Sequence, residues 1–155
     1  MLQRNKTRRP TKVGGRFAIV ASEYNRRYVD AMVRAARREL RRVGVRSIKV
    51  ARVPGAFEIP AVAAKLAGAP TPGYSAIICL GVIFRGETTH AEHIGNAVSL
   101  ALAQIQVERK MPVIHGVYLF ENEEQARVRC LSTRHGRGIE TARTAIAMAQ
   151  VMARL

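Results

Sequence analysis

The 155-residue sequence has two cysteines, no tryptophan, and 11 acidic residues against 26 lysines and arginines. Cys79 and Cys130 form no C-x-x-C pair, which argues against a redox motif and fits a reducing compartment with both thiols packed as small apolar groups. No apolar run reaches the ~18 residues of a membrane-spanning helix. The opening MLQRNKTRRPTK has no apolar stretch after its basic residues, unlike a signal peptide. We therefore expect a soluble, cytoplasmic protein.

The shortage of acidic residues leaves a formal net charge of +15. A charge of this size points to anionic partners. The alternative is that most arginines lie on solvated helix faces. Only 5% of the residues are aromatic, and no segment interleaves basic with aromatic residues as nucleic-acid-binding modules do. We expect no specific nucleic-acid partner, and a basic nucleic-acid-binding module is kept as an alternative function.

Four short apolar runs, partly β-branched, predict buried parallel strands. They are Arg16–Ala21, Ser47–Val53, Ser75–Val82 and Pro112–Leu119. Helical patterns lie between and after them, at Val29–Val43, Ile59–Ala67, Ile94–Ile105, Glu123–Cys130 and about Gly138–Leu155. Strands that alternate with helices predict an α/β fold whose parallel sheet is covered on both faces. We expect one domain over residues 13–155, preceded by a basic tail or added edge strand over residues 1–12.

In such sheets, ligands bind beyond the carboxyl ends of the strands. The loops at these ends contain SEYN, PGAFEIP, GVIFRGETTH and FENEE. A dinucleotide fingerprint is excluded, because Gly14 and Gly15 precede the first strand instead of following it. A metal site is not expected, because His90 and His93 lack a third ligand of an obvious type.

The third of these loops combines a helix start with features that favour phosphate. Thr89-His90-Ala91-Glu92 matches the capping box, in which Thr89 caps a helix and Glu92 reaches back. Gly86, Glu87 and Thr88 precede it and offer backbone N–H groups, a hydroxyl and the positive end of the helix dipole. The same pattern also fits an ordinary capped loop with a surface histidine.

Two motifs in this order resemble the lumazine synthase family of riboflavin biosynthesis. RVPGAFEIP begins at Arg52 and GVIFRGETTH begins at Gly81, and agreement continues through Pro112–Ile114, Glu124–Ala126 and Arg129. The resemblance implies a three-layer αβα sandwich with a four-stranded parallel sheet in flavodoxin-like order. It also implies a transferase that condenses 5-amino-6-(D-ribitylamino)uracil with 3,4-dihydroxy-2-butanone 4-phosphate to 6,7-dimethyl-8-ribityllumazine, phosphate and water, with no cofactor.

The resemblance further assigns roles to residues. His90 matches the family's proton-transfer histidine, and Tyr24 takes the place of an aromatic residue that stacks on the pyrimidine. The remaining matches are Ala56, Phe57 and Glu58 along the ribityl chain, Val82, Ile83 and Phe84 beside the pyrimidine, Glu87 and Thr88 facing the phosphate, and Arg129 binding it. Without the resemblance, Tyr24 and Phe57 equally fit core aromatics, and Glu58 and Arg129 fit solvated charges.

Three positions depart from the family pattern. Phe84 stands where isoleucine is usual, Glu87 brings a carboxylate toward the phosphate, and His115 replaces a frequent phenylalanine that contributes to the neighbouring subunit's site. We expect altered substrate affinity, and a catalytically weakened shell-forming homologue is the alternative.

The resemblance implies a homopentamer, which some members assemble into a sixty-subunit shell. The turn Ser132–Gly138 carries no insertion relative to shell-forming members, whereas the +15 charge would repel within a closed particle.

Overall fold

The protein is described by a computed structural model covering residues 12–155. Nearly all of the predicted basic tail, with the added edge strand, therefore lies outside the described residues. No helix in the described range is both long and apolar enough to cross a membrane.

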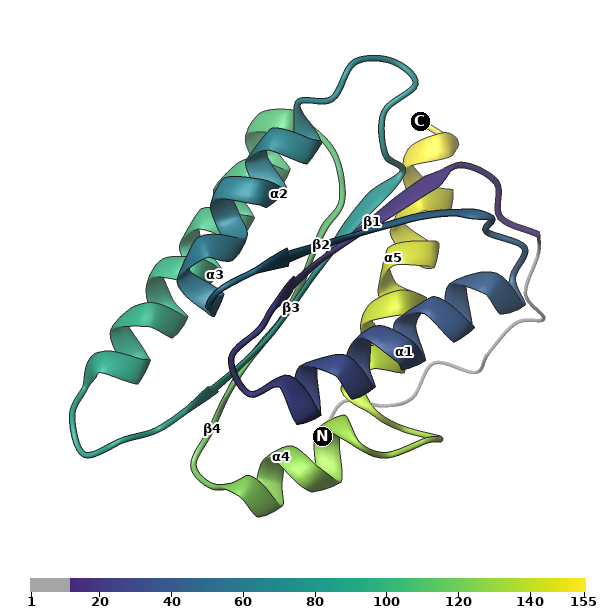
Figure 1. Ribbon diagram of the computed structural model, residues 1–155. Helices are drawn as coiled ribbons and strands as arrows, with labels where there is room; N and C mark the ends of the chain where they lie inside the picture. Colours follow the sequence, from purple (N-terminus) through teal and green to yellow (C-terminus); the bar gives the residue numbers. More distant parts are fainter. Residues whose placement is uncertain (1–11) are drawn as a thin grey trace.

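Within residues 12–155, four parallel strands form one sheet in the order β2-β1-β3-β4 (Figure 1). Their bounds are β1 Arg16–Ser22, β2 Ser47–Val53, β3 Ala76–Phe84 and β4 Val113–Phe120. The predicted number, direction and flavodoxin-like order of the strands are confirmed. β3 runs two residues beyond the predicted end at Val82, because Ile83 and Phe84 pair with Leu119 and Phe120 of β4.

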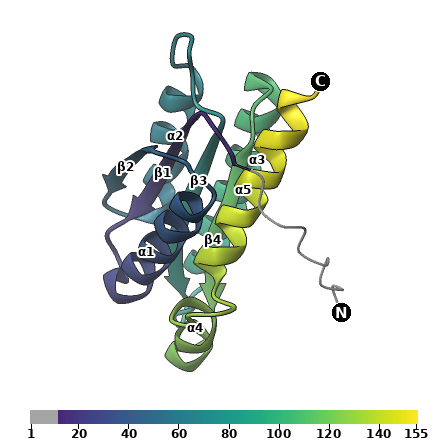
Figure 2. The same cartoon turned by 90° about the vertical axis from the view of Figure 1, so that its right-hand side faces the viewer.

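The five α-helices of the described residues cover the two faces of the sheet (Figures 1 and 2). α1 (Arg26–Arg42), α4 (Glu123–Cys130) and α5 (Arg137–Ala153) lie on one face, and α2 (Ile59–Ala67) and α3 (His90–Arg109) lie on the other. Alternate side chains of β1 point to opposite faces of the sheet. Phe17 and Ile19 pack in the core under α1 and α5, whereas Ala18 and Val20 pack in the core under α2 and α3. The three-layer sandwich is confirmed.

Helix α1 shows why the sequence pattern predicted these elements. Its buried side includes Val29, Met32, Ala36 and Leu40, at the three- and four-residue spacing of a helix. The helix ends before Gly44, whose φ of 95° is a left-handed conformation that glycine adopts readily. A short 3₁₀ helix, η1 (Ala56–Glu58), was not predicted.

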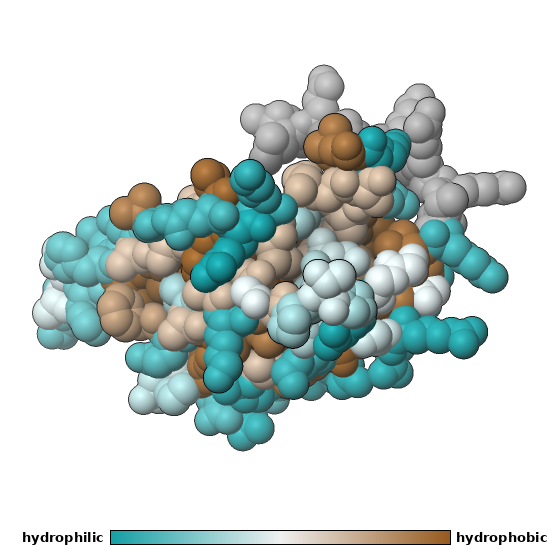
Figure 3. Space-filling model, turned by 90° about the horizontal axis from the view of Figure 1, so that it is seen from above, coloured by the Kyte–Doolittle hydropathy of each residue, from teal (hydrophilic) through white to brown (hydrophobic). Residues whose placement is uncertain are grey.

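Helix α3 differs from α1 because its apolar residues do not form a single buried stripe. Only Ala91, Val98 and Leu102 are buried, whereas Leu100 and Val107 are 72% and 74% exposed. The view from the top of Figure 1 likewise shows apolar side chains exposed between projecting hydrophilic ones (Figure 3). α3 therefore presents apolar surface that the chain itself does not cover.

Candidate active site

A cavity of about 820 Å³ lies where the first three strands end, at the edge of the sheet that the sequence indicated. Its walls come from Tyr24–Asn25 after β1, Gly55–Glu58 after β2 and Val82–Phe84 at the end of β3. Helix α3 adds a further wall along one face. Its contribution is His90, His93, Ile94 and Ala97.

The segment after β1 is fixed by Asn25. Asn25 has a left-handed backbone (φ 57°), and its side-chain amide donates to the carbonyl oxygen of Val82 at 2.7 Å. The N–H of Tyr24 donates to the carbonyl oxygen of Pro54 at 3.1 Å, which joins the loops after β1 and β2. The Tyr24 side chain is 70% exposed, so it is a cavity wall and not a core aromatic.

The segment after β2 is a compact turn that presents Phe57 and Glu58 to the same cavity. The Glu58 carboxylate accepts a hydrogen bond from the N–H of Gly55 at 2.9 Å. A Cβ at Gly55 would lie 2.9 Å from Oε2 of Glu58 and 3.0 Å from Cδ2 of Tyr24, so a larger residue would have to displace these two side chains. Phe57 is 60% exposed, which also rules out a core role.

Two imidazoles of α3 line the cavity. His90 is the first residue of the helix, and His93 follows three residues later on the same face. Nε2 of His93 lies 3.3 Å from Oγ1 of Thr89. His93 was not among the predicted site residues, although it lines the cavity. Its spacing of three residues from His90 was the signal that could have revealed it.

The capping-box prediction at the start of α3 was only partly right. The helix begins at His90 as expected, but the side chain of Thr89 makes no capping hydrogen bond. Glu92 pairs with Arg85 at 2.6 Å instead of reaching back to Thr89, because a guanidinium offers the carboxylate a stronger, charge-assisted partner. The hydroxyl of Thr88 accepts from the N–H of His90 at 3.3 Å.

Eight of the twelve predicted site residues line the cavity: Tyr24, Ala56, Phe57, Glu58, Val82, Ile83, Phe84 and His90. Four do not. Glu87 and Thr88 are exposed in the loop before α3, Arg129 is exposed on α4, and His115 is on β4 at the sheet edge. Asn25, Gly55, His93, Ile94 and Ala97 are the lining residues that the prediction omitted.

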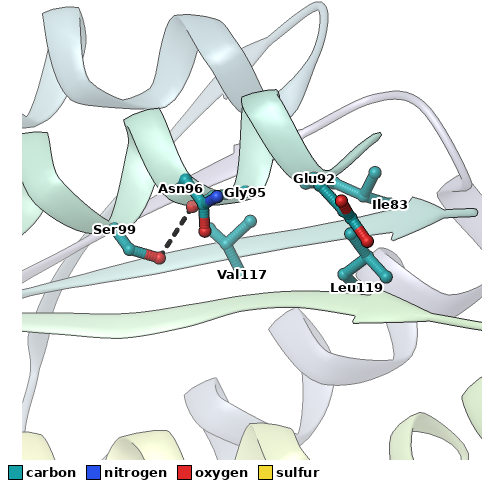
Figure 4. A pocket seen from close by; sticks show the side chains of 7 residues that line it. All are labelled: Ile83, Glu92, Gly95, Asn96, Ser99, Val117 and Leu119. Atoms are coloured by element: carbon teal, nitrogen blue, oxygen red, sulfur yellow. Dashed lines mark hydrogen bonds between the residues drawn. The ribbon is translucent and has the colours of Figure 1, made fainter. Parts of the chain in front are cut away.

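A second hollow of about 370 Å³ lies between α3 and β4 (Figure 4). It is lined by Ile83, Glu92, Gly95, Asn96, Ser99, Val117 and Leu119. The hydroxyl of Ser99 donates to the carbonyl oxygen of Gly95 at 2.7 Å and lies 2.7 Å from Nε2 of His115. Since the hydroxyl has only one hydrogen, Nε2–H of His115 is the donor to Ser99. Partial burial lowers the pKa of His115 below its ordinary value.

The cysteines and the acidic residues form no metal site within residues 12–155. No three His, Cys, Asp or Glu side chains in that range are grouped closely enough to hold a metal ion. Burial raises the pKa of Cys79 to about 12 and that of Cys130 to about 11, so both thiols are packed apolar groups as predicted.

Fold and cavity together define an α/β protein with a cavity at the carboxyl edge of its parallel sheet. Residues 14–153 match the family model of 6,7-dimethyl-8-ribityllumazine synthase. A protein of that name from Stenotrophomonas maltophilia (strain R551-3) is 38% identical over 147 residues, covering 94% of each chain. Another from Pyrococcus furiosus is 39% identical over 142 residues, covering 92% of this chain and 88% of the relative. The chain therefore belongs to the 6,7-dimethyl-8-ribityllumazine synthase family, and the resemblance in its motifs is confirmed.

Proposed function

We propose that this chain condenses 5-amino-6-(D-ribitylamino)uracil with 3,4-dihydroxy-2-butanone 4-phosphate, and releases 6,7-dimethyl-8-ribityllumazine, phosphate and water. Membership of the family supports this activity. The observation that carries it is that His90, Glu58 and two exposed aromatic rings line one cavity of suitable size.

The proposed chemistry depends on positioning and proton transfer. The amine adds to the ketone, an imine forms, phosphate is eliminated and the ring closes. Holding the two reactants side by side supplies most of the acceleration, and the imidazole of His90 carries protons between them. Tyr24 and Phe57 offer flat apolar surfaces to the pyrimidine and the ribityl chain, and Glu58 accepts hydrogen bonds from ribityl hydroxyls.

The phosphate is assigned to the start of α3. Backbone N–H groups around Gly86–Thr88 and the positive end of the helix dipole favour an anion there. Glu87 is exposed and does not line the cavity, so its carboxylate can point to solvent while its backbone serves the phosphate. The exposed guanidinium of Arg129 completes the phosphate site in the proposal.

We infer that this last contribution comes from a second copy of the chain, in a cyclic homopentamer. Neither Arg129 nor His115 lines the cavity of its own chain. The exposed Leu100 and Val107 on α3 give apolar surface that an adjacent copy would bury. Light scattering at low and high salt distinguishes a pentamer from a larger shell, because repulsion between +15 chains weakens as salt rises.

One assay tests the activity. The purified full chain, given both substrates and no added metal, is expected to form the fluorescent lumazine. His90→Ala should slow formation by about 10²-fold or more, the usual loss of a general acid–base group. His135→Ala is the matched control, because His135 lies in the turn before α5 and outside the cavity. Failure of the unmodified protein to form product from verified substrates would overturn the proposal.

A further inference from the structure

Helix α1 is rich in arginine, and only two of its residues are acidic. Each of these carboxylates already pairs with two guanidinium groups: Asp30 with Arg26 and Arg52, and Glu39 with Arg42 and Arg143. The N···O distances are 3.4 and 2.7 Å at Asp30, and 2.8 Å for both pairs at Glu39. Neither carboxylate is therefore available to pair with the other arginines of the helix.

Five more arginines follow the outer side of α1, opposite its buried residues. We call them the arginine stripe: Arg27, Arg34, Arg37, Arg38 and Arg41. Arg27, Arg34 and Arg41 are seven residues apart and lie nearly in line, so the stripe is about 21 Å long at 1.5 Å per residue. Arg37 and Arg38 fill the second half of it.

The arginine stripe has no acidic partner in the part of the chain that the structure describes. Within residues 12–155, none of its five members forms an ion pair. Residues 1–11 contain no Asp or Glu that could supply one. Arg27 instead lies over the ring of Tyr28, with its guanidinium carbon 5.6 Å from the ring centroid. Five like charges along one helix face repel one another, so an anion that bridges them relieves that repulsion.

We propose that the arginine stripe binds the sugar–phosphate backbone of a nucleic-acid duplex, without sequence preference. Its length of about 21 Å matches about six base-pair steps of 3.4 Å. Guanidinium groups bind phosphate through two parallel N–H donors, which suits a row of arginines to a row of phosphates.

A duplex fits this surface better than a single strand does. Proteins that hold single strands stack the bases on exposed aromatic rings. Among the described residues, the large exposed aromatic side chains are Tyr24 and Phe57, and both belong to the cavity walls. The stripe therefore offers charge without a stacking surface. This binding is separate from the proposed catalysis, because no member of the stripe lines the cavity.

The test compares two variants that lose the same charge from opposite faces of the sheet. The stripe variant carries Arg34→Gln, Arg37→Gln and Arg41→Gln on α1. The control variant carries Lys65→Gln, Arg109→Gln and Lys110→Asn, at α2 and the end of α3. Asparagine is chosen at Lys110 because it tolerates that residue's φ of 50°. Circular dichroism verifies that both variants fold.

Binding of the full chain to a labelled DNA duplex is measured by fluorescence anisotropy over a series of salt concentrations. The unmodified protein should bind with a steep salt dependence. The stripe variant should bind at least tenfold more weakly, with the slope of log K against log salt reduced by about two to three, because each lost phosphate contact removes about 0.9. The control variant should change affinity less than threefold.

Three results would overturn the proposal. They are the absence of duplex binding at about 50 mM salt, an equal loss in the stripe and control variants, and tighter binding to a single strand than to the duplex. A fourth result would also overturn it, namely displacement of the duplex by polyglutamate at equal charge concentration. The stripe would then bind any polyanion, without a preference for phosphate groups.

Discussion

The side-chain amide of Asn25 donates a hydrogen bond to the carbonyl oxygen of Val82, at 2.7 Å. This bond ties the loop after β1 to the end of β3. The backbone of Asn25 is left-handed, and its carbonyl oxygen accepts from the N–H groups of Tyr28 and Val29 in the first turn of α1. One residue thus begins a helix and closes a wall of the candidate active site.

Substitutions at Asn25 separate these two contributions. Asn25→Gly keeps access to the left-handed conformation and loses the hydrogen bond, so the free energy of unfolding should fall by about 1 kcal/mol. Asn25→Ala loses both the hydrogen bond and easy access to the left-handed conformation. Its free energy of unfolding should fall by about 2–3 kcal/mol, because a left-handed backbone costs a non-glycine residue about 1–2 kcal/mol. Urea denaturation of both variants measures the difference. If alanine proves no worse than glycine, the backbone conformation is not what requires asparagine.

The start of α5 depends on close contact with α1. A Cβ at Gly138 would clash with the backbone of Met32, lying 2.7 Å from its Cα and closer still to its carbonyl oxygen. Gly138→Ala should therefore force the two helices apart and lower the free energy of unfolding by about 1–3 kcal/mol. Gly14→Ala is the control, since nothing lies within 4 Å of a Cβ there, and it should change stability by less than about 0.5 kcal/mol. Equal melting temperatures for the two variants would contradict this account.

Much of the fold could be predicted because the signals for helices and strands are local. The strand Ser47–Val53 and the helices Ile59–Ala67 and Glu123–Cys130 were predicted with the bounds that the structure shows. The end of β3 was not, because Phe84 joins the strand through its pairing with Phe120. The periodicity of one segment does not show pairing between residues as far apart in sequence as Phe84 and Phe120.

The same limit applies to the candidate site. Glu58 and His90 lie in recognisable motifs, whereas Asn25 acts through a left-handed backbone and a partner 57 residues away. The capping box failed at Glu92 because a local pattern does not show that Arg85 competes for the same carboxylate. Arg129 and His115 were assigned through the resemblance, and within one chain they lie away from the cavity.

Glu58 is proposed to act through its charge, and a single substitution isolates that charge. In Glu58→Gln, the amide oxygen can still accept from the N–H of Gly55, so stability should change little. KM for the ribitylaminouracil should rise about tenfold, because a charge-assisted hydrogen bond contributes about 1.5–3 kcal/mol. Glu108→Gln is the control, at the far end of α3 from the cavity. Steady-state kinetics that show an unchanged KM would remove Glu58 from the proposed ribityl site.

His115 should make stability depend on pH in a defined direction. Burial lowers the pKa of His115 below its ordinary value of 6.5, so the unfolded chain binds a proton there more readily than the folded chain does. The stability contributed by neutral His115 is fully present above pH 6.5, and it is lost as the pH falls from there through the lower pKa of the folded chain. Between about pH 7.5 and about pH 5.5, His115→Phe should therefore lose less unfolding free energy than the unmodified chain, measured by urea denaturation at each pH. Parallel losses in the two proteins would show that the imidazole beside Ser99 is not responsible.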